Sequence, residues 1–413
     1  MVETEVQKER VILVGVSEQD GDDTKDSLEE LKELVATAGA VTEGMVIQNR
    51  ERIHPGTYVG TGKVSEIKEM LAKTGATGIV CDDELSPAQM KNLEDLLDTK
   101  VMDRTLVILD IFAAHASTSE GKIQVELAQL RYSMTRLAGF GRSMSRLGGG
   151  IGTRGPGEKK LEMDKRIIRT RISQLKRELA EVKKHREVAR GQRTRNHVPV
   201  AAIVGYTNAG KSTLLNHLTH AGVLEEDKLF ATLDPTTRQL ELPGKQQILL
   251  TDTVGFIRKL PHHLIEAFKS TLEEAKYADF IIHVVDASNP QADKQMYIVY
   301  NTLRELDIRD KKIVTLFNKM DRPEADGELR DFRADHTARI SARNDRDLET
   351  VKELLAQVLR ENKTYMEHVF SYEDAGKIQV IRRQGELLSE EYTPEGIFVK
   401  AYISTEVYDR LGI

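Results

Sequence analysis

The sequence GYTNAGKST at 205–213 lies between an apolar, β-branched run at 200–204 and a leucine-rich run at 214–218. This order predicts a strand, a glycine loop and a helix, the arrangement that binds phosphate groups. The glycines let successive backbone N–H groups turn toward the phosphates, and the helix N-terminus adds the positive end of its dipole. We expect Lys211 to reach the β- and γ-phosphates and Ser212 to offer its hydroxyl to Mg²⁺. An ordinary glycine turn is the alternative, but the flanking runs argue against it.

A carboxylate and a glycine end the next apolar run, in the sequence DTVG at Asp252–Gly255. A carboxylate at the carboxyl end of a buried strand beside a phosphate loop is placed to hold Mg²⁺, usually through water. Gly255 can direct its N–H at the γ-phosphate. The DxxG pattern alone is weak, but its position after the phosphate loop makes it a strong indication of a nucleotide site.

The sequence NKMD at Asn318–Asp321 predicts which base the site selects. The Asp321 carboxylate can accept hydrogen bonds from both guanine N1–H and the 2-amino group, whereas adenine has no such donor pair. A site built around such donors rejects a base that lacks them by roughly 10⁴ to 10⁵. We expect Lys319 to pack along the base and Asn318 to brace the loop. Ser341–Arg343 falls where a backbone N–H to the guanine carbonyl is expected.

A polar segment with three threonines, Phe230–Thr237, lies between the first two motifs. A threonine there would complete the Mg²⁺ shell in the triphosphate state and release it after hydrolysis, which would make the segment a switch. The residues alone do not decide among Thr232, Thr236 and Thr237.

The chain of 413 residues is too long for one ordinary core, so several domains are expected. Residues 10–117 alternate strand and helix patterns, which predicts a parallel α/β domain. Its expected strands are Val11–Val16, Ala40–Ile47, Gly78–Cys81 and Lys100–Met102, and its expected helices are Ser27–Ala38, Lys63–Lys73 and Ser86–Asp98. Within it, the sequence YVGTGK at Tyr58–Lys63 lacks the spacing of a phosphate loop and predicts a turn before a helix. Asp82–Glu84 likewise predicts an acidic turn rather than a metal cluster.

A nucleotide domain is expected at 198–362, followed by a small α/β module at 363–413. The expected strands of the nucleotide domain begin near Val200, Ile248, Phe280, Ile313 and Arg339, and its last helix is Leu348–Glu361. In the module we expect strands at Ile378–Ile381 and Gly396–Ile403 and a short helix at Ser404–Leu411.

The region 118–195 predicts an antiparallel helical hairpin, because apolar residues recur at alternating steps of three and four along two stretches. The connection at 139–157 has 8 glycines in 19 residues and no acid. Residues 131–195 contain 19 Lys and Arg against 6 Asp and Glu, although the whole chain carries a net charge of −6. Such a local excess indicates a contact with a polyanion, and shape-dependent RNA binding fits best. The expected RNA contacts are Arg142, Arg146, Arg154, Lys159 and Lys160.

The composition, with 31% charged and 39% hydrophobic residues, is that of a soluble globular protein. Its apolar runs are far shorter than the ~20 residues of a membrane helix. The single cysteine, Cys81, excludes an internal disulfide and a cysteine metal cluster, which favours the cytoplasm, with peripheral membrane association as an alternative location. We expect a monomer in solution.

The order GYTNAGKST, FATLDPTTR, DTVGF and NKMD resembles the HflX family of ribosome-associated GTPases. The stretches ELSPAQMKNLE (84–94), DRTLVILDIFAAHASTSEGKIQVELAQL (103–130) and RLGGGIGTRGPGEKKLE (146–162) carry the same resemblance, which extends to about residue 345. It implies a parallel α/β domain, a helical hairpin and a P-loop GTPase domain with a doubly wound sheet. It also implies binding of GTP and GDP, with ATP in some members, and action on the large ribosomal subunit and its RNA at stalled or idle ribosomes.

Residue by residue, the resemblance assigns Mg²⁺ ligation to Ser212 and Thr232. The nucleotide contacts that it implies are Gly205, Tyr206, Thr207, Asn208, Ala209, Gly210, Lys211, Ser212, Phe230, Ala231, Thr232, Leu233, Asp234, Asp252, Thr253, Val254, Gly255, Asn318, Lys319, Met320, Asp321, Ser341, Ala342 and Arg343.

Phe256 follows the DTVG glycine, where Ras-like enzymes carry a glutamine that orients the attacking water. A phenylalanine cannot hydrogen-bond water, so we expect slow intrinsic hydrolysis that a ribosomal partner stimulates, and no catalytic residue is assigned. Two other functions stay open at this point. One is an ATP-dependent RNA-remodelling enzyme, and the other is a GTP-regulated scaffold whose hairpin binds proteins.

Overall fold

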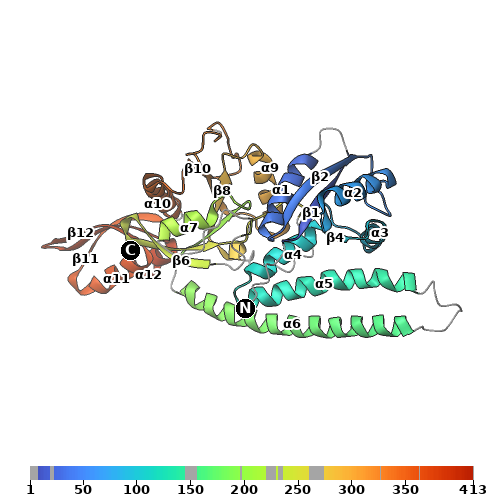
Figure 1. Ribbon diagram of the computed structural model, residues 1–413. Coiled ribbons are helices and arrows are strands. Elements are labelled where there is room, and N and C mark those ends of the chain that lie inside the picture. Colours follow the sequence, from blue (N-terminus) through green and yellow to red (C-terminus); the bar gives the residue numbers. More distant parts are fainter. Residues whose placement is uncertain are drawn as a thin grey trace, which may run out of the picture. The chain divides into compact units, whose positions relative to one another are not determined.

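The computed structural model describes residues 8–18, 23–144, 156–195, 198–219, 229–230, 236–259, 274–325, 327–361 and 363–412 (Figure 1). The chain divides into two compact units. The first consists of Met1–Lys183 with the short segments Asp227–Asp234 and Ile257–Lys269, and the second of Lys184–Glu226, Pro235–Phe256 and Ser270–Ile413. Each unit is described by itself.

The first unit contains a parallel sheet in the order β2-β1-β3-β4. Its strands are β1 (Arg10–Ser17), β2 (Val41–Asn49), β3 (Gly78–Cys81) and β4 (Lys100–Asp103). Its helices are α1 (Thr24–Thr37), α2 (Thr61–Thr74), α3 (Pro87–Leu97) and α4 (Arg104–His115). Alternate residues of β1 share a core with α2 and α3, while its other side chains, such as Leu13, are buried beneath α1 and α4. The predicted parallel α/β fold is confirmed.

Local capping explains where these helices begin. Ser86 and Gln89 form a reciprocal capping box at the start of α3, and Asp103 accepts a hydrogen bond from Leu106 N at the start of α4. The turn predicted for YVGTGK is confirmed, because Gly60 precedes the first residue of α2. Helix α4 was not predicted, since its continuous apolar run shows no helical period.

The predicted helical hairpin consists of α5 (Ser119–Met144) and α6 (Pro156–Arg195), which lie side by side in Figure 1. Leu127, Ile172 and Leu175 form the buried centre of the predicted apolar seam. The bidentate ion pair between Arg171 and Glu126 also joins the helices, with Nε 2.6 Å from Oε1. The connection between the helices is shorter than the predicted 139–157, because α5 continues to Met144 and α6 begins at Pro156. Adding residues to an existing helix is easier than starting one, so both helices extend into the glycine-rich sequence.

The second unit contains a six-stranded sheet in the order β10-β9-β8-β5-β7-β6. Its strands are β5 (Val200–Gly205), β6 (Thr236–Leu242), β7 (Gln246–Asp252), β8 (Phe280–Asp286), β9 (Lys312–Asn318) and β10 (His336–Arg339), with the 3₁₀ turn η1 (Pro243–Lys245) between β6 and β7. Only β6 runs antiparallel to its neighbour among these described strands. The sequence had not predicted β6, whose first residues, Thr236 and Thr237, were candidates for the switch threonine.

Helices cover both faces of this sheet. Helices α7 (Lys211–Thr219) and α10 (Asp345–Arg360) share one core with the strands, and α9 (Ala292–Glu305) packs in another. On the α9 side, buried Asp331 accepts hydrogen bonds from Tyr300 and Thr315, both at 2.7 Å, and lies 3.7 Å from His283 Nδ1. Strand β5 pairs with β7 on one side and with β8 on the other, and the later strands β9 and β10 follow on the β8 side. The sheet is therefore doubly wound and reverses its order at β5.

The carboxyl-terminal module is a three-stranded antiparallel sheet in the order β11-β13-β12, with two helices on one face. It consists of β11 (Thr364–Phe370), η2 (Tyr372–Asp374), α11 (Ala375–Gln384), β12 (Glu386–Thr393), β13 (Gly396–Ile403) and α12 (Thr405–Leu411). The strand predicted at 378–381 is wrong. Ile378 and Ile381 lie on one face of α11, three residues apart, and both are buried against the sheet.

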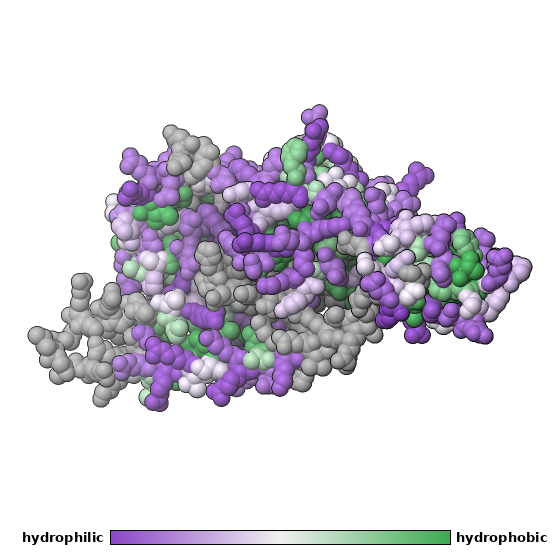
Figure 2. All heavy atoms as spheres, turned by 180° about the vertical axis from the view of Figure 1, so that it is seen from behind, coloured by the Kyte–Doolittle hydropathy of each residue, from purple (hydrophilic) through white to green (hydrophobic). Residues whose placement is uncertain are grey.

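The face of the molecule shown in Figure 2 is mainly hydrophilic, with apolar side chains in small groups. Among the described residues, the helices are too short or too polar to cross a membrane.

Candidate nucleotide-binding site

The phosphate loop connects β5 to α7 at the point where the strand order reverses. Gly205 and Gly210 have φ angles of 156° and 94°, and Asn208 has a φ of 60°. A Cβ atom at Gly205 would collide with the carbonyl of Val284 on β8, and one at Gly210 with the Asn318 side chain. Glycine is therefore required at both positions by conformation and by space.

Lys211 is buried at the first position of α7, and its Nζ donates to the carbonyl of Tyr206 at 2.7 Å. Burial lowers the pKa of Lys211 to about 8, although the nearby Asp252 carboxylate acts in the opposite direction. The ammonium group therefore lies inside the loop, where an anionic phosphate would stabilise its charged form.

The Ser212 hydroxyl donates to Asp252 Oδ2 at 2.8 Å. Asp252 is fully buried at the end of β7, and the next side chain, Thr253, donates to the carbonyl of Ile203 at 2.8 Å. A hydroxyl and a carboxylate side by side at a phosphate loop are oxygen donors of the type that Mg²⁺ takes, so the residues fit this ion. In the part of the chain that the structure describes, no cluster of three or more His, Cys, Asp or Glu residues could hold a metal.

The DTVGF segment lies against the phosphate loop. Thr207 N donates to the carbonyl of Phe256 at 2.8 Å, and Phe256 N donates to the carbonyl of Gly205 at 3.0 Å. The Phe256 side chain is buried. These two backbone hydrogen bonds join the second motif directly to the first.

Asn318 joins the base-side motifs to the phosphate loop. Its Nδ2 donates to the carbonyl of Ala209, and its Oδ1 accepts from Ala342 N, both at 2.9 Å. Lys319 Nζ lies 2.7 Å from both the carbonyl of Asn208 and Asp286 Oδ2. The structure thus brings the glycine loop, the NKMD turn and the Ser341–Arg343 turn together.

Asp321 is exposed beside this turn. A hydrogen bond with Ser341 lowers the pKa of the Asp321 carboxyl, so the group is held in its charged, accepting form. Ser341 N in turn donates to Asp347 Oδ2 at 2.7 Å, which fixes the turn to the start of α10.

Sequence reasoning missed Asp286, the partner of Lys319. A signal was available, because Asp286 ends a buried apolar strand in the same way that Asp252 does. The bond between Asp286 and Lys319 joins the end of β8 to the NKMD turn, and the same Lys319 ammonium also donates to the phosphate loop at the carbonyl of Asn208.

Some residues predicted for the nucleotide site, and the residues predicted as RNA contacts, are not placed in this site. Ala231–Asp234, which include Thr232, lie outside the described residues, as do Arg146 and Arg154. Arg142 belongs to α5, and Lys159 and Lys160 belong to α6. Phe230 is buried in the first unit, where its ring packs edge to face on Phe112 of α4 with centroids 4.7 Å apart.

A phosphate loop at the reversal point of a doubly wound sheet, with a DTVG strand end and a braced NKMD turn, defines the class of P-loop GTPases. Family comparisons agree. Residues 25–113 match the family described as "GTP-binding GTPase N-terminal". Residues 115–193 match the family "GTP-binding GTPase Middle Region", and residues 200–319 match the family "50S ribosome-binding GTPase".

The chain is 67% identical to "GTPase HflX" of Lacrimispora saccharolytica over 100% of this chain and 97% of that protein. It is 47% identical to "GTPase HflX" of Caldanaerobacter subterraneus subsp. tengcongensis over 98% of this chain and 93% of that protein. A solved GTP-binding protein from Sulfolobus solfataricus in complex with GDP is 26% identical, with a TM-score of 0.44, over 84% of this chain and 98% of that chain. The chain belongs to the HflX family of GTPases, and it is a GTP hydrolase.

Proposed function

We propose that this GTPase binds the large ribosomal subunit in its GTP-bound state and separates the subunits of stalled or idle ribosomes under stress. The observation that carries the proposal is the match of residues 200–319 to a family described as 50S ribosome-binding GTPases, in the same chain as a long basic helix. Helix α6 contains 14 Lys and Arg against 6 Asp and Glu in 40 residues. Such a helix favours a polyphosphate surface such as ribosomal RNA.

In this proposal the nucleotide lies across the loop 205–212. Lys211 and the loop N–H groups bind the phosphates, Gly255 contacts the γ-phosphate, and Asp321 selects guanine. Ser212, assisted by Asp252, would hold Mg²⁺ together with Thr232 of the switch segment. The ion would neutralise charge that develops on the phosphate oxygens during transfer.

Hydrolysis requires an oriented water, and the buried Phe256 side chain does not supply a hydrogen bond for it. We propose that the ribosome orders the switch segments and so completes the site. Single-turnover GTP hydrolysis with and without large subunits tests this step. Equal rates under both conditions would refute stimulation by the ribosome.

Subunit separation is tested directly by mixing 70S ribosomes with the protein and following light scattering. A fall in scattering is expected with GTP or a non-hydrolysable analogue, and a smaller one with GDP. The matched variant is Lys211→Ala, which removes the phosphate-binding ammonium and should abolish the difference between nucleotides. Ribosomes that stay associated under every nucleotide condition would disprove the splitting function while leaving subunit binding to be measured by sedimentation.

A further inference from the structure

Phe332 lies in the segment between β9 and β10 and is 89% exposed. Among the described residues, no other large apolar side chain is exposed to this degree. Scattered exposed apolar residues are normal on protein surfaces, so exposure alone indicates nothing about function. The way in which the surrounding backbone holds this ring distinguishes it from them.

The segment is anchored on both sides of Phe332. Before the ring, Leu329 is buried in the core on the α9 side of the sheet. Asp331 accepts hydrogen bonds of 2.7 Å from hydroxyl groups on α9 and β9. After the ring, Asp335 N donates to the carbonyl of Ile313 at 2.9 Å, and Asp335 Oδ2 accepts from Ile313 N at 2.8 Å. The ring is therefore presented by a fixed backbone, which lowers the ordering cost of binding a partner.

Two arginines flank the exposed ring. Arg330 and Arg333 are both exposed. Arg333 N donates to Asp331 Oδ1 at 3.0 Å, and its guanidinium carbon lies 5.0 Å from the centroid of the Tyr300 ring. Among the residues that the structure describes, neither guanidinium forms an ion pair with a carboxylate. Asp331, the acid between the two arginines, is turned inward to its hydroxyl donors, so the exposed side chains of the run 330–333 carry a charge of +2.

A second exposed ring belongs to the same surface. Tyr297 lies one helical turn before Tyr300, on the same face of α9, and is 58% exposed. We call the side chains of Arg330, Phe332, Arg333 and Tyr297 the Phe332 patch. It combines flat rings with cations that have no acidic partner.

This combination fits unpaired RNA. An unpaired base stacks on an aromatic ring without requiring a pocket, and guanidinium groups beside the ring meet the phosphates of the same strand. Each phosphate so neutralised releases counterions, which favours binding. A protein partner would instead need a pocket for the ring and carboxylates placed for both arginines.

We propose that the Phe332 patch binds single-stranded RNA, with a base stacked on Phe332 and phosphates contacted by Arg330 and Arg333. The choice of RNA rests on the proposed ribosomal function, for which the patch supplies a contact on the GTPase domain. The patch is separate from the nucleotide site, because Asp335 pairs with the start of β9 while the NKMD turn follows its end.

The first test uses a short single-stranded RNA that carries 2-aminopurine, whose fluorescence falls when it stacks on a ring. Binding is measured on the full-length protein, and every variant retains the basic hairpin. Phe332→Ala should lose most of the quenching and weaken binding about fivefold or more, the range of one base on one aromatic ring. Phe332→Tyr should behave like the native protein. Phe332→Leu should behave like Phe332→Ala, since leucine keeps apolar volume but offers no flat face.

Salt dependence tests the arginines separately. For a single strand, each phosphate contact contributes about 0.7 to the slope of log affinity against log salt. Arg330→Gln and Arg333→Gln should each reduce the slope by about that amount. Intrinsic GTP hydrolysis should stay unchanged in all these variants, because the patch does not contact the nucleotide site.

The matched control is Tyr392→Ala, which removes an exposed ring with acidic surroundings. Tyr392 is 69% exposed on β12, and its hydroxyl donates to Glu390 Oε1 at 2.9 Å. This variant should bind the RNA as the native protein does. The proposal is overturned if Phe332→Ala quenches and binds like the native protein, if Phe332→Leu does so, or if Tyr392→Ala weakens binding equally.

A second test places the patch on the ribosome. Phe332→p-benzoylphenylalanine is irradiated with purified large subunits, and the crosslink is expected on an unpaired nucleotide, located by primer extension. A crosslink to ribosomal protein alone would overturn RNA as the partner of the patch. Native protein that stacks the oligonucleotide but does not sediment with large subunits would refute the ribosomal function and leave RNA binding by the patch supported.

Discussion

Asn318 is the buried brace between the phosphate loop and the Ser341–Arg343 turn, and its replacement by alanine isolates this role. The change removes two hydrogen bonds of 2.9 Å, to the carbonyl of Ala209 and from Ala342 N. Each bond whose partner is left buried and unpaired costs about 1–3 kcal/mol, so the loss is about 2–6 kcal/mol. The free energy of unfolding should fall by an amount in this range.

Nucleotide affinity should fall as well, because the loop and the base-side turn are no longer held at a fixed separation. A loss of about 1.4 kcal/mol in binding corresponds to tenfold in the dissociation constant, and we expect at least about that for GDP. Urea denaturation measures the first quantity, and titration with a fluorescent GDP derivative measures the second.

A matched variant separates the two hydrogen bonds of Asn318. Asn318→Asp keeps an acceptor for Ala342 N but places a carboxylate oxygen against the carbonyl of Ala209. It should therefore disturb the phosphate loop more than the base-side turn. GDP binding within about threefold of the native value in Asn318→Ala would refute the idea that this side chain aligns the two halves of the site.

Four other outcomes are expected. Asp321→Asn should exchange guanine preference for xanthine, as measured by nucleotide competition, and unchanged GTP selectivity would show that another residue reads the base. Ser212→Ala should raise the Mg²⁺ concentration that gives half-maximal GTP hydrolysis by about tenfold or more, as measured by metal titration, with GDP binding less affected. If the basic hairpin binds RNA through about 6–10 phosphate contacts, affinity for large subunits should fall by about 10³–10⁵ between 50 and 200 mM salt, whereas a protein interface along the apolar seam would barely respond. Burial would raise the pKa of Asp331, but hydrogen bonds with its histidine, tyrosine and threonine partners lower it below its value in the unfolded chain. The ionised carboxylate therefore stabilises the fold at a pH above the pKa that Asp331 has in the unfolded chain, and this stability is lost as pH falls toward the lower pKa of the folded state. Asp331→Asn should accordingly flatten the acid limb of a plot of unfolding free energy against pH.

Local patterns in the sequence were sufficient where neighbouring residues carry the information. The phosphate loop, the ends of β7 and β9, and the apolar seam of the hairpin each depend on residues within one or two turns or strands. Patterns failed where tertiary contacts decide the structure. The apolar run of α4 has no period that distinguishes a helix from a buried strand. The apolar residues at 378–381 fit a strand as well as a helix, and only packing against the sheet of β11, β12 and β13 decides for the helix.

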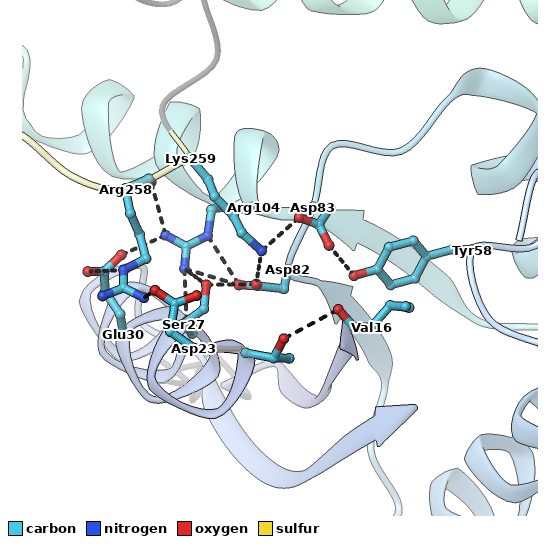
Figure 3. A network of polar contacts seen from close by, with 11 residues as sticks. Val16, Asp23, Ser27, Glu30, Tyr58, Asp82, Asp83, Arg104, Arg258 and Lys259 are labelled. Atoms are coloured by element: carbon cyan, nitrogen blue, oxygen red, sulfur yellow. Dashed lines mark hydrogen bonds and ion pairs between the residues drawn. The ribbon is translucent and has the colours of Figure 1, made fainter. Parts of the chain in front are cut away.

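The sequence by itself determined the motifs of a nucleotide-binding site and the guanine preference that NKMD predicts, because the order of motifs prescribes the chemistry at the carboxyl ends of adjacent parallel strands. Only the tertiary structure decided what surrounds those motifs. Lys259 and Asp82, which form an ion pair in the first unit (Figure 3), are separated by 177 positions, and no local feature of the acidic turn near residue 82 indicates which cation pairs with it. Folding pairs them because a buried carboxylate requires a cation, and the cation that reaches it belongs to the segment that would sense the γ-phosphate.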